Sequence, residues 1–248
     1  MALNLRFFVN NLHLIPVFPR LYQQGKRIKA EVPELPEAKG NTGIAGSQQE
    51  HILQLLCIGE STIAGVGVAT HAEGFSGTLA EELSEIWGVQ IRWEVQAKSG
   101  YTARKVHERL VPKIQQRPDI IVVGLGGNDS FQLNSRSQWK KDINDLIDSL
   151  RSINPLAEIY FTNLPPAHIF PAFTPLIKKV IGKRVNALAQ VLDKIVEPMP
   201  NVFFSSEPIS IDTWSKRYQV KAEESQFFSD GVHPSKLTYQ VWAKDMAT

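Results

Sequence analysis

Two stretches of the sequence bring together residue types that could carry out nucleophilic and acid–base chemistry. Ser61 follows an apolar run at residues 52–58 and stands between Gly59 and Gly65. A serine directly after a buried strand lies at the carboxyl edge of the sheet, where open α/β proteins bind their ligands. Serine is also a common residue of glycine-rich turns, so Ser61 alone fits a simple turn equally well.

The second stretch lies near the other end of the sequence, where Asp230 precedes His233 by three residues and Pro234 follows. Proline suits the first turn of a helix, which places His233 at a junction between a loop and a helix. A carboxylate on the imidazole Nδ1–H fixes the tautomer and leaves Nε2 free to act as a base. A single histidine at such a junction is usually structural, but the spacing of Asp230, together with Ser61, favours a catalytic pair.

Two glycine loops offer hydrogen-bond donors. Gly100 allows the backbone to approach a ligand closely, although a plain turn explains it equally well when it is taken alone. Asn128 follows a glycine pair after a buried apolar run and offers a side-chain amide. Asp129, next in the chain, could simply cap a helix. The loop has neither the G-x-x-x-x-G-K-[ST] nor the G-x-G-x-x-G pattern, which argues against a nucleotide site.

Strands and helices are expected to alternate and to position these loops. Apolar runs predict strands at residues 52–58, 91–97, 119–125, 157–162 and 202–204. Helical periodicity predicts helices at residues 75–87, 102–116, 137–152, 176–196 and 235–246, and Pro112 is expected to kink or shorten the second of these. This order predicts an α/β protein with three layers (α/β/α) and a doubly wound, five-stranded parallel sheet of the flavodoxin-like type.

The first 47 residues differ from the rest and are predicted to form an extension and a linker, so that one domain spans residues 48–248. The extension combines apolar residues with Arg20, Lys26, Arg27 and Lys29. Two interpretations stay open: a segment packed on the domain, or a peripheral membrane contact through residues 1–30. Asn10 and Asn11 interrupt the apolar run, which argues against a standard signal peptide. The expected location is cytoplasmic, with or without membrane association.

Composition excludes several classes of protein. The 248 residues fit one large domain, and the net charge of +2 gives no reason to expect a nucleic-acid partner. The single cysteine, Cys57, excludes an internal disulfide and is expected to be a small buried hydrophobic residue. No apolar run reaches the roughly 18 residues of a membrane span. The histidines do not show the spacing of metal ligands, so no metal site is predicted.

Taken together, the motifs resemble those of the SGNH hydrolase superfamily, the GDSL-type esterases and lipases. The family carries a G-D-S-x-x-x-G block, a later glycine, a G-x-N-D block and a D-x-x-H block. The sequence matches them in that order with residues 59–65, Gly100, residues 126–129 and residues 230–233. One departure is Glu60, where the family usually has Asp; the charge is kept and the side chain is longer by one carbon. Residues 1–47 are not covered by the resemblance.

The resemblance implies a role for each motif residue. Ser61 is expected to be the nucleophile and His233 its general base, oriented by Asp230. The backbone N–H groups of Ser61 and Gly100, with the Asn128 side chain, are expected to form an oxyanion hole. Residues 48–248 become the catalytic domain, no metal or organic cofactor is required, and the substrate is a small-molecule acyl ester.

Residues that select the substrate are less clearly encoded. The apolar, proline-rich segment 163–173 follows the fourth predicted strand and is either a wall of an acyl pocket or a packed structural loop. The candidate substrate-binding residues are Thr62, Tyr101, His168, Phe170 and Phe173.

Several activities fit the same catalytic residues. Beside a carboxylesterase or lipase, a thioesterase, a lysophospholipase or a carbohydrate O-deacetylase stays open. A non-catalytic binding protein and a membrane-surface scaffold are the alternatives from other classes, and the complete set of catalytic residue types argues against both. The oligomeric state is not encoded.

Overall fold

The computed structural model describes residues 16–47 and 51–248. The apolar residues of the extension before position 16, and that part of the predicted membrane contact, lie outside the described residues. Within these two ranges, no helix is both long enough and apolar enough to cross a bilayer.

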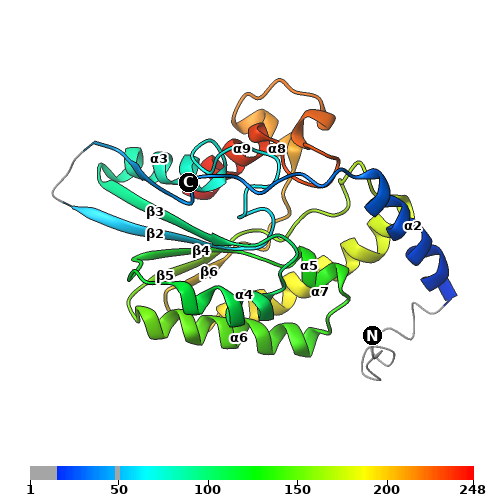
Figure 1. Ribbon diagram of the computed structural model, residues 1–248, viewed down its shortest axis with the longest axis horizontal. Helices are drawn as coiled ribbons and strands as arrows, with labels where there is room; N and C mark the ends of the chain where they lie inside the picture. Colours follow the sequence, from blue (N-terminus) through cyan, green and yellow to red (C-terminus); the bar gives the residue numbers. More distant parts are fainter. Residues whose placement is uncertain (1–15, 48–50) are drawn as a thin grey trace.

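A six-stranded sheet forms the centre of the protein, in the order β1-β3-β2-β4-β5-β6 (Figure 1). Five strands run parallel to one another: β2 (Ile52–Gly59), β3 (Gln90–Ala97), β4 (Ile120–Gly124), β5 (Glu158–Phe161) and β6 (Val202–Phe204). A sixth strand, β1 (Thr42–Ala45), pairs antiparallel with β3 at one edge. The α/β class and the five parallel strands are confirmed, and the predicted strand count was too low by one.

Helices cover both faces of the sheet, which gives the predicted three layers (Figure 1). One face carries α3 (Phe75–Trp87) and α9 (Lys236–Ala247), and the other carries α4 (Ala103–Arg109), α6 (Arg136–Ile153) and α7 (Pro175–Val196). The shorter elements are α2 (Phe18–Glu31), α5 (Gly127–Phe131), α8 (Ile211–Arg217), η2 (Val111–Lys113) and η3 (Glu224–Phe227).

Each face of the sheet has its own apolar core because successive strand residues point to opposite sides. In β2, Leu55 and Cys57 belong to the core under α3 and α9, whereas Leu56 and Ile58 belong to the core under α4, α6 and α7. Cys57 is fully buried, as predicted, and burial raises the pKa of its thiol to about 12. Burial on both faces explains why the central strands read as continuous apolar runs.

The strand β1 lies within the segment that the sequence predicts to be a linker. Gly43 of β1 stands opposite Trp93 of β3, and a Cβ on Gly43 would come within 2.3 Å of the Trp93 ring. Glycine is required there because the indole covers the strand, so the prediction of a linker is wrong for residues 42–45. The proposed domain boundary at residue 48 stays a prediction.

The helix predicted at residues 102–116 is shorter than expected. α4 ends at Arg109, and the 3₁₀ turn η2 follows. Pro112 lacks a backbone N–H and its ring clashes with the preceding turn, so the α-helix cannot continue through it. The other four predicted helices are confirmed to within one residue at each end.

Candidate active site

Three loops meet at one edge of the sheet because the strands before them end in register. Gly59 at the end of β2 pairs with Ala97 of β3 and with Gly124 of β4. The loops that follow these strands hold the predicted nucleophile and the predicted oxyanion-hole residues. The register of three neighbouring strands therefore brings together positions up to 68 residues apart in sequence.

Two backbone donors at this edge have no acceptor within the protein. In residues 16–47 and 51–248, the N–H groups of Ser61 and Gly100 make no hydrogen bond. Gly100 has a φ of +81°, a conformation that glycine adopts without strain. Unpaired backbone N–H groups are rare in folded proteins unless solvent or a ligand satisfies them. These two are therefore available to an oxygen atom of a ligand.

Glu60 connects the loop after β2 with the loop after β4. Its Oε1 accepts the backbone N–H of Gly127 at 2.7 Å, and its Oε2 accepts the backbone N–H of Asn128 at 2.8 Å. The same Oε2 accepts the Asn128 side-chain amide, at 2.5 Å from Nδ2. Burial raises the pKa of Glu60 to about 7, although these N–H donors favour the carboxylate. The residue that departs from the family motif thus fixes both the backbone and the side chain of Asn128.

The Asn128 amide also reaches the loop after β3. Its Nδ2 lies 3.1 Å from the carbonyl oxygen of Tyr101, so the amide joins all three loops. Both of its N–H groups face protein acceptors in this conformation.

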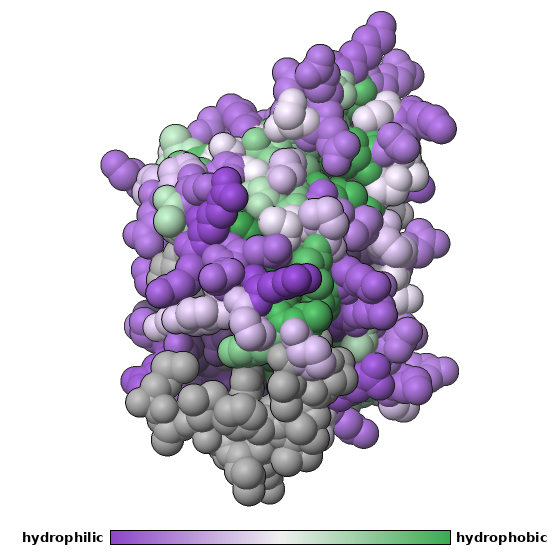
Figure 2. All heavy atoms as spheres, turned by 90° about the vertical axis from the view of Figure 1, so that its right-hand side faces the viewer, coloured by the Kyte–Doolittle hydropathy of each residue, from purple (hydrophilic) through white to green (hydrophobic). Residues whose placement is uncertain are grey.

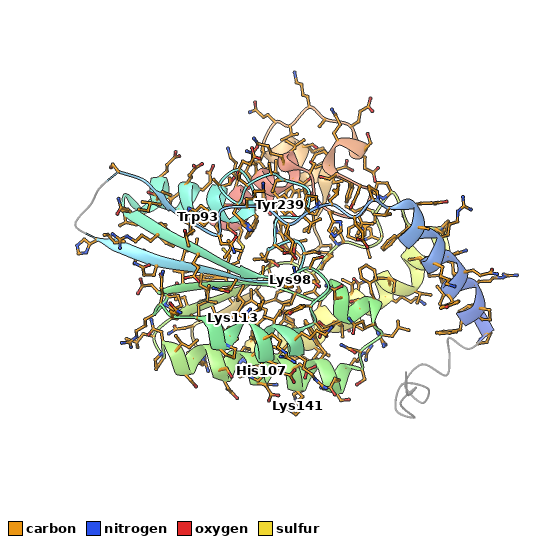
Figure 3. All side chains as sticks on the ribbon, in the orientation of Figure 1. Trp93, Lys98, His107, Lys113, Lys141 and Tyr239 are labelled. Carbon is orange, nitrogen blue, oxygen red and sulfur yellow. The ribbon has the colours of Figure 1, made fainter. Side chains whose placement is uncertain are left out.

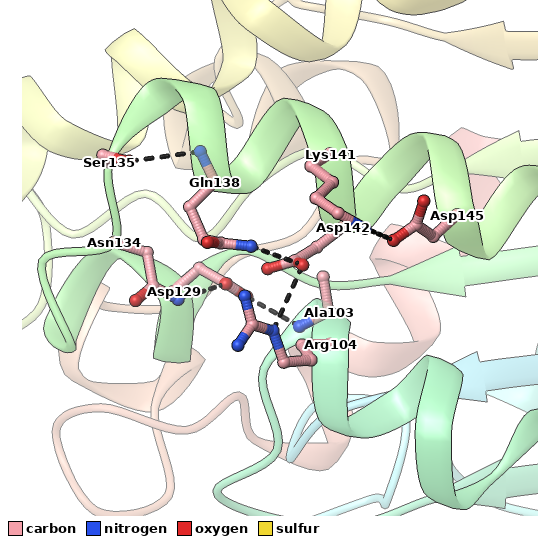
Figure 4. A network of polar contacts seen from close by, with 9 residues as sticks. All are labelled: Ala103, Arg104, Asp129, Asn134, Ser135, Gln138, Lys141, Asp142 and Asp145. Carbon is pink, nitrogen blue, oxygen red and sulfur yellow. Dashed lines mark hydrogen bonds and ion pairs between the residues drawn. The ribbon is translucent and has the colours of Figure 1, made fainter.

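Asp129 is a helix cap, as one interpretation of the sequence suggested, but it caps a different helix from its own. Its Oδ2 accepts the backbone N–H of Ala103 at 2.9 Å, at the first residue of α4 (Figure 4). Its Oδ1 accepts the Asn134 amide at 2.7 Å. Asp129 is fully buried, and burial raises its pKa to about 6. The carboxylate thereby fixes the loop that carries Asn128 to the helix that follows Gly100.

The structure brings Asp230 and His233 into direct contact. Asp230 Oδ2 lies 2.7 Å from Nδ1 of His233. Its Oδ1 accepts the backbone N–H groups of Val232 at 2.9 Å and of His233 at 2.7 Å. Burial opposes ionisation of Asp230, but the His233 ring and these N–H donors hold its pKa below the usual value. This geometry orients the imidazole and leaves Nε2 as its free nitrogen.

The loop that carries His233 is docked against the turn that carries Ser61. Ser229 Oγ donates to the carbonyl oxygen of Gly67 at 3.2 Å. Tyr239 of α9 donates its hydroxyl to the carbonyl oxygen of Val66 at 2.8 Å (Figure 3). Gly67 has a φ of +108°, and a Cβ there would lie 2.4 Å from the carbonyl oxygen of Pro234. The close approach of the two segments therefore requires glycine at position 67.

A small apolar cavity of about 40 Å³ adjoins both segments. Thr62 lines it beside Ser61, and Val232 and Pro234 line it on either side of His233. Its remaining walls are mainly apolar: Pro165, Pro166, Ile169, Phe170, Ile209, Ile211, Trp214, Phe227, Phe228, Thr238 and Trp242. Residues 163–173 thus contribute to the wall of a cavity beside the motif residues.

The five candidate substrate-binding residues occupy different places. Thr62 and Phe170 line the cavity. Phe173 packs edge-on against Phe170, at 5.1 Å between ring centroids. Tyr101 is half-buried and its carbonyl oxygen accepts the Asn128 amide, whereas His168 is exposed.

Several cavity residues come from the segment between β6 and α9 and were not predicted from the sequence. Trp214 lies on α8, which is a two-turn helix that was not predicted, and Ile209 and Phe228 lie in irregular loops. α8 has seven residues, too few to show a helical period, so the local sequence carried no clear signal for this wall.

The described part of the chain has no group of three or more His, Cys, Asp or Glu side chains arranged to hold a metal ion. The expectation that no cofactor is required stays a prediction.

Comparisons with solved structures show proteins with the same fold. A lipase, Lip_vut3 from a goat rumen metagenome, is 19% identical with a TM-score of 0.58; the match covers 78% of this chain and 95% of the lipase. A structure of TesA is 18% identical with the same TM-score, and the match covers 78% of this chain and 95% of TesA. A family 3 carbohydrate esterase from Clostridium thermocellum is 16% identical with a TM-score of 0.55, over 78% of this chain and 92% of the esterase.

No protein of curated function matches the chain. The model of the GDSL-like lipase/acylhydrolase family matches residues 57–241. This range begins within β2 and ends within α9, so it includes every loop of the candidate site. The chain therefore belongs to the GDSL-like lipase/acylhydrolase family and is a hydrolase that acts on ester bonds.

Proposed function

We propose that the protein hydrolyses small carboxylic esters through an acyl-enzyme on Ser61. The observation that carries the proposal is the oriented Asp230–His233 pair, docked through Gly67 on the turn of Ser61 and beside the apolar cavity. His233 Nε2 takes the proton of the Ser61 hydroxyl as Oγ attacks the carbonyl carbon of the ester. The tetrahedral intermediate then expels the alcohol, which receives that proton from His233. Water, activated by the same base, releases the acid from the acyl-enzyme.

The oxyanion is stabilised by the two backbone N–H groups that have no protein acceptor, those of Ser61 and Gly100. The Asn128 amide supplies a third donor. Of its two hydrogen bonds, the one to the Tyr101 carbonyl is the longer, and the amide gives up this bond to donate to the substrate oxygen. Glu60 retains the amide during this exchange. Catalytic hydrogen bonds often tighten only when the substrate is bound.

The cavity beside Thr62 indicates short acyl chains. A volume of about 40 Å³ holds roughly three water-sized groups, which matches an acyl chain of two to four carbons. Longer chains require the aromatic side chains of its wall to move. The proposed substrates are therefore acetyl to butyryl esters; thioesters and acetylated sugars carry the same acyl groups and belong in the same assay.

The test is hydrolysis of p-nitrophenyl acetate, butyrate and octanoate by the wild type and by Ser61→Ala. The wild type is expected to prefer the two shorter esters, and loss of the nucleophile lowers turnover by about a million-fold. Ser137→Ala, which removes an exposed hydroxyl on α6, is the matched control and should retain full activity.

Substantial turnover by Ser61→Ala would exclude the proposed mechanism. A folded wild type without activity on esters, thioesters or acetylated sugars would favour the non-catalytic alternative. A preference for octanoate would exclude only the assignment of the acyl cavity.

A further inference from the structure

The side of the molecule that carries α2 has a basic hollow outside the proposed active site. The hollow measures about 740 Å³ and lies between the start of α2, the start of α6 and the first half of α7. Four cations line it: Arg136, Lys179, Lys183 and Arg184. Every other described residue of its lining is apolar or serine, and none is acidic. We call these four cations the basic face.

Two of these cations repel each other when no anion lies between them. Lys179 and Lys183 are four residues apart on α7, so their like charges repel each other along the helix. No carboxylate of residues 16–47 and 51–248 lies within ion-pair distance of Arg136, Lys179 or Lys183. Burial lowers the pKa of Arg184, and the charge of Arg136 lowers it further. The hollow is therefore complementary in charge to an anionic occupant.

The helix α2 extends this surface with apolar and aromatic side chains. Val17, just before α2, lines the hollow, and Leu21 and Ile28 pack against the core. A hydrogen bond of 2.6 Å from Thr174 Oγ1 to Gln24 Oε1 holds α2 beside the start of α7. These contacts bury one face of α2 and fix the direction of its opposite face.

The outer face of α2 presents aromatic rings beside a cation. Phe18 is 42% exposed and Tyr22 is 57% exposed. The Lys26 ammonium lies 5.2 Å from the centroid of the Tyr22 ring. Figure 2 views this side and shows hydrophobic side chains gathered in a band with hydrophilic side chains on both flanks. Exposed aromatic rings together with cations are typical of helices that lie in the interface of a membrane.

This surface lies on the same side of the molecule as the candidate active site. The carboxyl ends of the parallel strands point toward the side that carries α2 (Figure 1). Ile169 and Phe170, which line the acyl cavity, belong to the connection that leads directly into α7. α2 itself precedes the region matched by the family model, so it is an addition to the matched domain.

We propose that α2 and the first half of α7 form a docking surface for a bilayer that contains anionic phospholipid. The basic face binds lipid phosphate groups, and Phe18 and Tyr22 enter the interface beside it. The proposal does not depend on the activity at Ser61. Docking in this orientation turns the active-site edge of the sheet toward the membrane.

The test is flotation of the full chain with vesicles of phosphatidylcholine, with or without about 30 mol % phosphatidylglycerol. The wild type should float only with the anionic vesicles, and more weakly at about 0.5 M salt than at low salt, because salt screens the attraction. Lys179→Glu/Lys183→Glu should weaken binding by at least about tenfold, since each basic residue near an anionic surface contributes separately. Phe18→Ser/Tyr22→Ser should reduce the binding that persists at high salt.

The matched control is Lys113→Glu/Arg117→Glu, which changes the net charge equally. Lys113 lies away from α2 (Figure 3). This control is expected to bind as the wild type does. Equal losses in the two charge-reversed variants would mean that net charge alone matters, and would overturn the proposal. If the wild type does not float with anionic vesicles, the proposal is overturned as well. This outcome includes the case in which the basic face binds an acidic protein and not a membrane.

Hydrolysis of a soluble ester by Lys179→Glu/Lys183→Glu should stay within about twofold of the wild type, which shows that the fold is intact. Ser61→Ala should float as the wild type does. A failure of the proposed hydrolysis is thereby distinguished from a failure of docking.

Discussion

The longer side chain of Glu60 has a physical role in this site. It accepts hydrogen bonds from two backbone N–H groups and from the Asn128 amide, and it is 2% exposed. An isolated buried carboxylate is costly, but one that accepts three N–H donors is stabilised and rigid. Glu60 therefore acts on the proposed reaction through the position of Asn128 and does not touch the reacting atoms.

Glu60→Gln is predicted to lower kcat about 10- to 100-fold with little change in KM. The substitution replaces a carboxylate oxygen with an NH₂ group, which then faces N–H donors of residues 127 and 128 instead of accepting from them. Removal of a complete oxyanion donor costs about 10²- to 10³-fold, so Asn128→Ala sets the upper limit. The double variant is expected to be no slower than Asn128→Ala alone. Effects that multiply in the double variant would contradict the positioning role.

At the scale of elements, apolar runs and strand ends were predictable and contacts distant in sequence were not. The motif residues could be placed because each follows a strand that reads clearly as apolar. β1 was missed because its glycine reflects contact with Trp93 and not a flexible chain. The cavity wall around Trp214 was missed because α8 is too short to show a helical period. Both omissions depend on tertiary contacts that local sequence does not contain.

One of these distant contacts supports the loop that carries Gly100. Glu37 Oε1 accepts the backbone N–H of Ser99 at 2.7 Å, and its Oε2 pairs with Lys98 at 2.9 Å. Nearby, the N–H of Ala38 donates to the carbonyl oxygen of Ala64, in the turn that follows Ser61. The segment before β1 thus fixes two loops of the candidate active site.

Glu37→Ala is predicted to lower kcat by roughly threefold to tenfold, because the Gly100 loop loses its acceptor and a hydrogen bond to a charged group. The thermal midpoint should fall by only a few degrees, since the Glu37–Lys98 pair is partly exposed. Kinetics with a short p-nitrophenyl ester test this. Glu34→Ala is the matched control, because Glu34 is an exposed carboxylate three residues earlier. An equal decrease in both variants would argue against the role of Glu37.

At the scale of the whole molecule, the site makes stability depend on pH. Burial raises the pKa of Glu60 to about 7 and that of Asp129 to about 6, above the ordinary values of 4.5 and 3.8. Between the ordinary and the raised values the folded protein binds more protons than the unfolded chain. The stabilisation from this uptake is complete at low pH and is lost as the pH rises through 6 to 7.

The free energy of unfolding should therefore be lower at pH 8 than at pH 5.5, with on the order of 2 kcal/mol contributed by Glu60. Buried His71 has a lowered pKa and acts in the opposite direction as the pH falls. The informative quantity is the difference between the wild type and Glu60→Gln in urea unfolding at the two pH values. The variant should lose less stability between them, and identical losses would show that Glu60 is ionised throughout this range.

The docking of α9 on the turn after Ser61 also determines when a newly made chain can act. In the proposed mechanism Ser61 is made early, but its base His233 is docked on the Ser61 turn only when Tyr239 reaches Val66 and Trp242 packs on Phe75 of α3. A nascent chain whose α9 is still inside the exit tunnel has a serine without its base. The proposed hydrolysis therefore requires α9 to have left the ribosome, and every strand of the sheet precedes α9 in the chain.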